Sequence, residues 1–325
     1  MISGPVPILS LRSLEVHTPV LDEALAFYTE VWGLTSVESD RDAVWLRASG
    51  PEHHVLALRR APIQGLGKIT FSLPTADDVD RTADYLETLS LPLICEPGPS
   101  EDPGGGYGLI TADNDGRRIE LLAETTAVAR QDISSGIPLR VTHVVLNTPD
   151  IDVSVAFWVD VFGFRVSDWS EHQMAFLRCN SYHHTIAFNQ AAWSSVNHVA
   201  YEMSDIDSYM RGIGRATQEG HPPAWGPGRH GPGDNTFAYF VDPSGFVCEY
   251  TAEVALVDEE TWIPRTWPRT PQLSDTWGTA GPPSAHVREH MAGLKDLGVL
   301  PEHPELAGFR TRPRSALKDR RDTKR

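Results

Sequence analysis

Three side chains far apart in the chain could together hold a metal ion. Glu249 lies in the apolar, aromatic run Phe-Val-Cys-Glu-Tyr, where burying a carboxylate costs free energy unless a cation meets it. No Lys or Arg stands close by in the sequence, but His143 and His198 occupy two strand-like runs, Thr-His-Val-Val and Asn-His-Val-Ala. Two histidines and a carboxylate that leave coordination positions open are the ligands that non-haem Fe(II) oxygenases use. Mn(II) accepts the same ligands, so the pattern favours either of these two ions.

A hairpin is expected to present Glu249. Two short apolar runs, 237–241 and 247–251, are joined by Asp-Pro-Ser-Gly, which is a strong turn sequence. Because side chains alternate along a strand, Glu249 shares one face with its second neighbours, and Cys248 turns to the other face. We therefore expect Glu249 to point to the site and Cys248 to pack in the core.

The chain repeats itself at an offset near 130 residues, which determines the expected fold. The repeated pairs are Thr18-Pro19 with Thr148-Pro149, Gly33 with Gly163, His53-His54 with His183-His184, and Glu120 with Glu249. Each half contains two βαβββ units, with helices expected over Leu21–Val31 and Ala76–Leu89 in the first. We expect an α+β fold of two tandem domains, 1–132 and 133–256, followed by a C-terminal extension, 257–325.

The repeat also supplies an internal control for the metal site. Ser13 and Lys68 stand where the second half has His143 and His198, and only Glu120 keeps the ligand type. A purely structural need for the histidines would have kept them in both halves. The sequence therefore predicts one metal site, in the C-terminal half.

In these residues the chain resembles the type I extradiol ring-cleaving dioxygenases of the vicinal oxygen chelate superfamily, the catechol 2,3-dioxygenase and dihydroxybiphenyl dioxygenase group. The resemblance covers residues 8–254 and is most specific between His143 and Glu249. It implies two tandem vicinal-oxygen-chelate domains, a metal-free N-terminal one and a catalytic C-terminal one. It also implies that His143, His198 and Glu249 are the iron ligands.

The resemblance further assigns three residues to the chemistry. His184 corresponds to an acid/base histidine, Tyr239 to an active-site tyrosine ten residues before Glu249, and His230 to a histidine near the substrate. An imidazole that titrates near neutrality could take a catechol proton and later return one. Tyr239 and His230 would donate hydrogen bonds to substrate oxygens.

Other residues are expected to shape the site without reacting. Phe176 and Val145 are apolar and are expected to line a dry side of the cavity, where O2 would bind. His183 is expected to point away from the cavity, and His53 and His54 to be structural.

The implied activity is Fe(II)-dependent cleavage of a catechol-type ring beside its two hydroxyls, with both atoms of O2 entering a muconic-semialdehyde-type product. Two alternatives stay open. One is an oxygenase like 4-hydroxyphenylpyruvate dioxygenase, which uses an α-keto acid as its own reductant. The other is a small-molecule-binding or resistance protein of the same superfamily that turns nothing over. Oxygen uptake with a catechol favours the ring-cleaving dioxygenase, and uptake with an arylpyruvate favours the α-keto acid oxygenase. Absence of bound metal favours the binding protein.

Composition excludes several other classes. The formal charge of −16 is concentrated outside a basic tail, 308–325, and an acidic body argues against nucleic-acid binding. No apolar run approaches the length of about 18 residues that a membrane span needs. Three widely spaced cysteines without a CxxC pair indicate reduced thiols and a cytoplasmic protein. Exposed sheet edges in this architecture suggest a homo-oligomer.

The extension is rich in Trp and Pro up to residue 283, so regular structure is not expected there before Ala285. A helix over Ala285–Leu297 is expected to pack back on the body. The Trp/Pro-rich part could cover the cavity as a lid or cover the interface between the domains, and both readings stay open.

Overall fold

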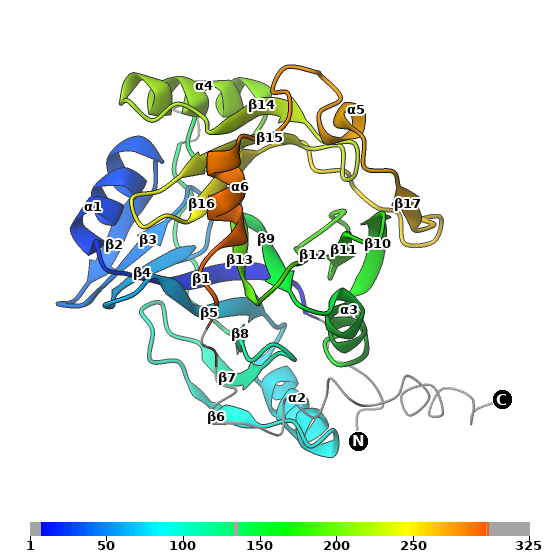
Figure 1. Cartoon of the computed structure of the whole chain (residues 1–325). Helices are drawn as coiled ribbons and strands as arrows, with labels where there is room; N and C mark the ends of the chain where they lie inside the picture. The colour runs from blue at the N-terminus through cyan, green and yellow to red at the C-terminus, as the bar shows by residue number, and fades with distance from the viewer. Residues whose placement is uncertain (1–7, 133–135, 297, 299–325) are drawn as a thin grey trace.

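The computed structural model describes residues 8–132, 136–296 and 298, and in them the chain forms two large β-sheets (Figure 1). The strand order is β2-β3-β4-β1-β5-β8-β7-β6 in the first sheet and β14-β15-β16-β13-β9-β12-β11-β10-β17 in the second. The expected α+β fold, with two tandem domains each made of two βαβββ modules, is confirmed. Short strands and helices build every module.

The modules follow one another along the chain. The first contains β1 (Ser10–Thr18), α1 (Leu21–Ala26), the π-helical turn η1 (Phe27–Val31), β2 (Thr35–Ser39), β3 (Ala43–Arg47) and β4 (Leu56–Arg60). The second contains β5 (Gly65–Ser72), α2 (Ala76–Thr88), β6 (Leu93–Pro99), β7 (Tyr107–Ala112) and β8 (Arg118–Ala123). The third contains β9 (Arg140–Thr148), α3 (Ile151–Asp160), β10 (Arg165–Ser170), β11 (Met174–Arg178) and β12 (Ile186–Gln190). The fourth contains β13 (Ser195–Glu202), α4 (Ile206–Gln218), β14 (Trp225–Arg229), β15 (Thr236–Val241) and β16 (Val247–Thr251).

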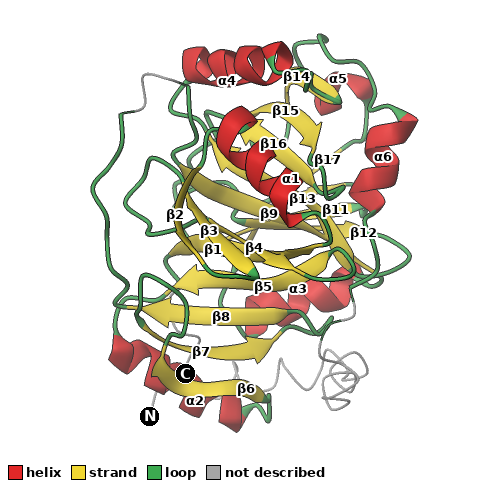
Figure 2. Cartoon of the chain, turned by 90° about the vertical axis from the view of Figure 1, so that its left-hand side faces the viewer, coloured by secondary structure: helices red, strands yellow, loops and turns green. Residues whose placement is uncertain are grey.

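Local sequence explains where the module helices begin. Thr75, Asp150 and Asp205 each accept a hydrogen bond on the side chain from a backbone N–H in the first turn of α2, α3 and α4. Such caps satisfy amide groups that have no partner inside the helix. The view in Figure 2 shows α2 and α4 at opposite ends of the molecule, with both sheets between them.

The two halves share one hydrophobic core. The ring of Trp32, just after η1, stacks on Tyr250 of β16 with centroids 3.8 Å apart. In the opposite direction, Trp158 of α3 meets Phe71 of β5 edge-on at 5.7 Å. Each half therefore packs its first helix against the other half, which fixes the two sheets relative to each other.

The extension differs from its expectation. It contains the strand β17 (Arg265–Trp267) and the short helix α5 (Pro271–Ser274) before α6 (Ala285–Ala292). Three residues between two prolines carry almost no strand signal, and β17 forms because the edge of β10 is free to pair with it. α6 ends where Gly293 takes a φ of +62°, earlier than expected, and packs over β13 and β16 (Figure 1). Residue 297 and the basic tail lie outside the described residues.

In the part of the chain that the structure describes, none of the helices has the length and apolar character needed to cross a membrane.

Candidate metal centre

Three adjacent strands at the middle of the second sheet carry the predicted cluster. His143 is on β9, His198 on β13 and Glu249 on β16. Ala200 of β13 pairs with His143 on one side and with Glu249 on the other, and His198 lies two residues before it. Because residues two apart share a face of a strand, all three side chains project from the same face of the sheet.

The three side chains converge on one point. His143 Nε2 and His198 Nε2 each lie 3.2 Å from Glu249 Oε2, and the three ligand atoms lie within 4.8 Å of one another. Two ligand atoms that bind an ion at about 2.1 Å and at right angles stand about 3 Å apart, so the spacing suits a divalent metal ion. Burial alone would raise the pKa of Glu249, but the two histidine contacts lower it to about 2, so the group is a carboxylate.

Two buried side-chain atoms of the cluster, His143 Nδ1 and Glu249 Oε1, lack a hydrogen-bond partner among the described residues. Within the described residues, Glu249 Oε1 is buried and accepts no hydrogen bond. An orphaned carboxylate oxygen in a core is costly, and a bound cation would satisfy it. The residues present therefore fit a metal ion of the kind expected from the sequence.

A second layer of amides orients His198. Its Nδ1 lies 2.8 Å from Asn197 Oδ1, which leaves the Nε2 lone pair directed to the cluster. Asn197 Nδ2 donates to Asn147 Oδ1 at 3.1 Å, and Asn147 Nδ2 donates to the carbonyl of Met291 at 2.7 Å. A hydrogen-bonded path therefore joins the predicted ligand to the last turn of α6.

A cavity of about 440 Å³ opens above the cluster. Every site residue expected from the sequence except Glu249 lines it: His143, Val145, Phe176, His184, His198, His230 and Tyr239. The extension supplies another part of the wall: Pro268, Arg269, Leu273, Ser274, Pro283, Arg288, Met291 and Ala292. The volume is in the range of about 300–1,000 Å³ that small-molecule sites occupy.

His184 lies in the short loop between β11 and β12, beside the cluster. Its ring centroid is 4.2 Å from that of His143, and its Nδ1 lies 3.1 Å from Nδ1 of His183. Burial, followed by the neighbouring histidines, lowers the pKa of His184 well below its usual value, which favours the neutral imidazole. His183 is fully buried and does not line the cavity, as expected.

Tyr239 and His230 are bonded to each other. The Tyr239 hydroxyl lies 2.9 Å from His230 Nε2, and His230 Nδ1 lies 2.8 Å from the carbonyl oxygen of Ser274. Because its Nδ1–H donates to that carbonyl, Nε2 of a neutral His230 accepts a hydrogen bond from the tyrosine hydroxyl. Trp225 stacks on the Tyr239 ring at 5.1 Å and fixes its plane. The sequence expected both residues to donate to substrate, whereas here the hydroxyl proton is shared between them.

One side of the cavity is apolar. Val145 and Phe176 pack with Ala187 in a small buried cluster, and the Phe176 ring lies 5.3 Å from His184. This is the side expected to be dry.

Several residues of the site carry no signal in the sequence. Asn147 and Asn197 read as ordinary strand residues, and only the position of Asn197 next to His198 hints at a role. Asp168, which bonds to His183 at 3.1 Å, lies in a strand of mixed polarity. Its one signal is the repeat, which places it opposite Glu38.

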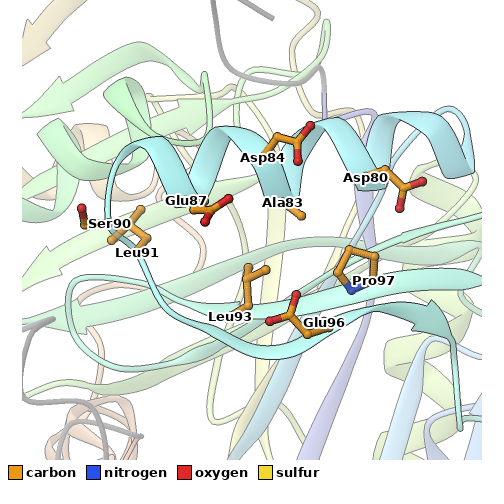
Figure 3. A pocket seen from close by; sticks show the side chains of 9 residues that line it. All are labelled: Asp80, Ala83, Asp84, Glu87, Ser90, Leu91, Leu93, Glu96 and Pro97. Atoms are coloured by element: carbon orange, nitrogen blue, oxygen red, sulfur yellow. The ribbon is translucent and has the colours of Figure 1, made fainter. Parts of the chain in front are cut away.

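In the N-terminal half a lysine stands at the equivalent point. Lys68 Nζ lies 3.1 Å from Glu120 Oε2 and 2.5 Å from Asp102 Oδ2. The ammonium group offsets the charge of a carboxylate that is only 5% exposed. A second hollow of about 510 Å³ lies in this half, between α2 and β6 (Figure 3). Its walls carry Asp80, Asp84, Glu87 and Glu96 and no histidine, so the cavity above the cluster is the candidate site.

Comparison with known proteins agrees with this architecture. The family described as "Glyoxalase/Bleomycin resistance protein/Dioxygenase superfamily" matches residues 11–121 and 140–250, one match in each half. Metapyrocatechase 2 of Cupriavidus necator is 34% identical over 130 residues, covering 39% of this chain and 41% of that protein. The chain thus spans less than half the length of this relative. Biphenyl-2,3-diol 1,2-dioxygenase of Paraburkholderia xenovorans is 25% identical over 278 residues, covering 78% and 92%.

A solved structure extends the comparison to the fold. The Mn(II)-bound glyoxalase from Novosphingobium aromaticivorans superposes with a TM-score of 0.83 at 38% identity, covering 86% of this chain and 94% of that one. The resemblance drawn from the sequence is confirmed at the level of the superfamily by matches that span both halves. The chain belongs to the Glyoxalase/Bleomycin resistance protein/Dioxygenase superfamily.

Proposed function

We propose that the protein is an extradiol dioxygenase that opens the ring of a catechol-type substrate with O2 to a muconic-semialdehyde-type product. The observation that carries this is the convergence of two imidazoles and one carboxylate beside a cavity of about 440 Å³, with the ring of His184 4.2 Å from that of His143. A relative that acts on an aromatic diol, matched over most of its length, supports the same substrate class.

In this proposal His143, His198 and Glu249 hold Fe(II), and Mn(II) fits the same donors. Bound there, such an ion would lower the pKa of a phenol and allow the ring and O2 to react. The protein's part is to present three ligands from one face of a rigid sheet and leave the opposite side free for substrate. Asn197 holds the His198 ring in the orientation that this requires.

His184 is the proposed base for the second hydroxyl of the diol. Its Nδ1 is bonded to His183, so the other ring nitrogen is left for the cavity that the side chain lines. A base must lie within hydrogen-bond reach of the proton that it takes. The His184 ring lies 4.2 Å from the ring of His143, a proposed metal ligand, so a diol bound to the metal would bring its hydroxyl within reach of His184.

Tyr239 and His230 are proposed to hold a substrate oxygen. If the Tyr239 hydroxyl turns away from His230, it can donate its hydrogen bond to a substrate oxygen instead.

Val145 and Phe176 are proposed to keep the side of the cavity where O2 binds free of water, since neither side chain offers a polar atom. Two guanidinium groups, Arg269 and Arg288, stand exposed at the wall that the extension provides.

The remaining expectations stay proposals. The three described cysteines are free thiols, which is consistent with a reducing, cytoplasmic setting. We retain the homo-oligomer expected from the sequence, together with the absence of a nucleic-acid partner that the acidic body favours.

A glyoxalase reaction is the second candidate, because the structural relative at 38% identity carries that name.

The experiment that tests the proposed function is an oxygen-uptake assay on protein purified and loaded with Fe(II) under anaerobic conditions. The panel contains unsubstituted, carboxylated and phenyl-substituted catechols, 4-hydroxyphenylpyruvate, and the adduct of a 2-oxoaldehyde with a thiol. Isomerisation of the thiol adduct consumes no O2, so its thioester product is followed by mass spectrometry. Uptake of one O2 per catechol with a yellow product supports the proposal. Turnover of the arylpyruvate or of the thiol adduct alone overturns it.

A further inference from the structure

A buried chain of hydrogen bonds runs from Asp168 through His183 to His184. Asp168 Oδ2 lies 3.1 Å from His183 Nε2, and His183 Nδ1 lies 3.1 Å from His184 Nδ1. None of the three residues is more than 3% exposed. These hydrogen bonds connect the buried carboxylate to the cavity through the two imidazoles.

The order of groups determines where the protons lie. An ionised carboxylate only accepts, so His183 carries its proton on Nε2 and offers the Nδ1 lone pair. His184 must then donate from Nδ1, which leaves its Nε2 unprotonated. No described residue bonds to His184 Nε2, and the ring lines the cavity. The free lone pair is therefore available to a ligand in the cavity.

The extension completes the environment of Asp168. Parallel pairing of β17 with β10 sets Arg265 beside Asp168, and the Arg265 backbone N–H donates to Oδ1 at 2.9 Å. The Trp267 indole N–H donates to Oδ2 at 2.7 Å, and the Arg265 side chain stands 3.9 Å from the same oxygen. These two donors of the extension, together with His183 Nε2–H, hold the carboxylate in its ionised form in one orientation.

The repeat shows which part of this chain belongs to the fold. In the N-terminal half the equivalent histidines, His53 and His54, also pair through their Nδ1 atoms, at 3.3 Å. Asp168 and Glu38 both follow a register shift at the same point of their strands, so they are equivalent positions. Glu38 is exposed, and no hydrogen bond or ion pair joins it to His53 within the described residues. The histidine pair is thus common to both halves, whereas the carboxylate link occurs only beside the cluster.

From this arrangement we infer that Asp168 and His183 are positioning residues that hold His184 in the Nδ1–H tautomer, with its Nε2 lone pair facing the substrate cavity. The inference rests on the proposed function only in taking His184 as the base. The carboxylate acts through His183, and neither residue touches the cavity. The extension takes part because it supplies two of the donors that orient Asp168.

Asp168→Asn tests the arrangement with little change of shape. The extension already supplies donors to both oxygens of residue 168, and an amide presents one N–H group where His183 needs an acceptor. His183 then moves its proton to Nδ1, and His184 must carry its own on Nε2. The direct readout is the long-range 1H–15N spectrum of histidine in protein loaded with Zn(II), which is diamagnetic, with His184→Phe to assign the signal. We expect Nδ1–H in the unchanged protein and Nε2–H in Asp168→Asn. Nε2–H in the unchanged protein, or the same tautomer in both, overturns the inference.

Kinetics with the diol that is turned over supply the second readout. Asp168→Asn is expected to lower kcat by about 10²–10³-fold, with KM and metal content changed by less than about twofold. Glu38→Gln makes the same chemical change at the equivalent position of the other half and is the matched control. If Asp168 served only to anchor β17, Trp267→Phe would lower kcat as far as Asp168→Asn, and that result contradicts a positioning role. Should no diol be turned over, the proposed function fails, and the spectrum still decides the inference.

Discussion

At the scale of single residues, the site follows from the cost of burying charge. Glu249 could be found in the sequence because a carboxylate inside an aromatic strand needs a cation, and two histidines in strand-like runs could hold one. Asp168 and Asn197 could not be found in this way. Their partners lie far away in sequence or are neighbours without a recognisable pattern. Apart from the repeat for Asp168 and the position beside His198 for Asn197, the sequence does not distinguish them from solvated strand residues.

Replacing His198 by lysine should convert the metal site into a copy of the other half. In the first half, Lys68 offsets the charge of Glu120 with an ammonium at 3.1 Å. His198→Lys should therefore fold and keep a cation beside Glu249, but should bind no iron and lose activity by more than about 10³-fold. Elemental analysis and thermal unfolding of the metal-free protein check this. A variant that still binds one iron per chain would contradict the assigned ligands.

The lysine itself should matter for stability. Lys68→Met leaves Glu120 and Asp102 without their shared cation, and breaking such a partly buried pair costs about 2–4 kcal/mol of unfolding free energy. Removing the second charge as well, in Lys68→Met with Glu120→Leu, should recover most of the loss. Urea unfolding of the single and double variants measures both values. Equal stability of Lys68→Met and the unchanged protein would show that the carboxylates are solvated.

At the scale of elements, the sequence predicts helices that a local pattern defines, but it does not predict elements that depend on pairing with distant segments. α2 was expected over Ala76–Leu89 and is found over Ala76–Thr88, because a capping threonine and an amphipathic pattern define it locally. β17 was not expected, since three residues become a strand only through the free edge of β10. The place of α6 over the second sheet likewise depends on a side chain of β9, Asn147, which donates to its last carbonyls.

Asn147→Ala should loosen α6. The change removes the hydrogen bonds to the carbonyls of Met291 and Ala292 and should speed amide exchange in α6 by about tenfold or more, as expected for a loss of about 1.5–3 kcal/mol. The matched control is Asn189→Ala, because the Asn189 side chain bonds to the Asn147 amide oxygen and to Gln173, and no described hydrogen bond joins it to α6. Hydrogen exchange measured by mass spectrometry on peptides spanning α6 distinguishes the two. Equal exchange in both variants would show that α6 is held by packing alone.

At the scale of the whole molecule, the repeat predicted two similar sheets but not how they meet. Periodicity indicates that one face of the helix expected over Leu21–Val31 is buried, without saying that Trp32, just beyond it, stacks on Tyr250 of the other half. The same contact region contains a buried hydrogen bond between the halves, from the Tyr28 hydroxyl to Asp242 Oδ2 at 3.0 Å. Interfaces of this kind follow from shape and cannot be read from a pattern.

Asp242 should make stability depend on pH. Burial raises its pKa to about 6 from an ordinary value of 3.8, so the folded state holds this proton more tightly than the unfolded state does. The unfolding free energy should therefore fall as the pH rises from about 4 to 6, by up to about 3 kcal/mol from this group. Asp242→Asn should remove that part of the slope while keeping an acceptor for the Phe246 N–H. Urea unfolding at several pH values measures the slope, and an identical slope in both proteins would contradict the assignment.

The fate of labelled oxygen tests most directly whether the protein cleaves a catechol ring with both atoms of O2. Iron-loaded protein would react with a catechol from the panel under ¹⁸O2, and the aldehyde of the ring-opened product would be reduced at once, because an aldehyde oxygen exchanges with water. The reduced product would be analysed by mass spectrometry. Both labelled atoms should enter one product molecule, and His198→Lys should lose this product together with the bound iron. A product with one labelled atom, or an unlabelled product, would contradict extradiol cleavage at the centre formed by His143, His198 and Glu249.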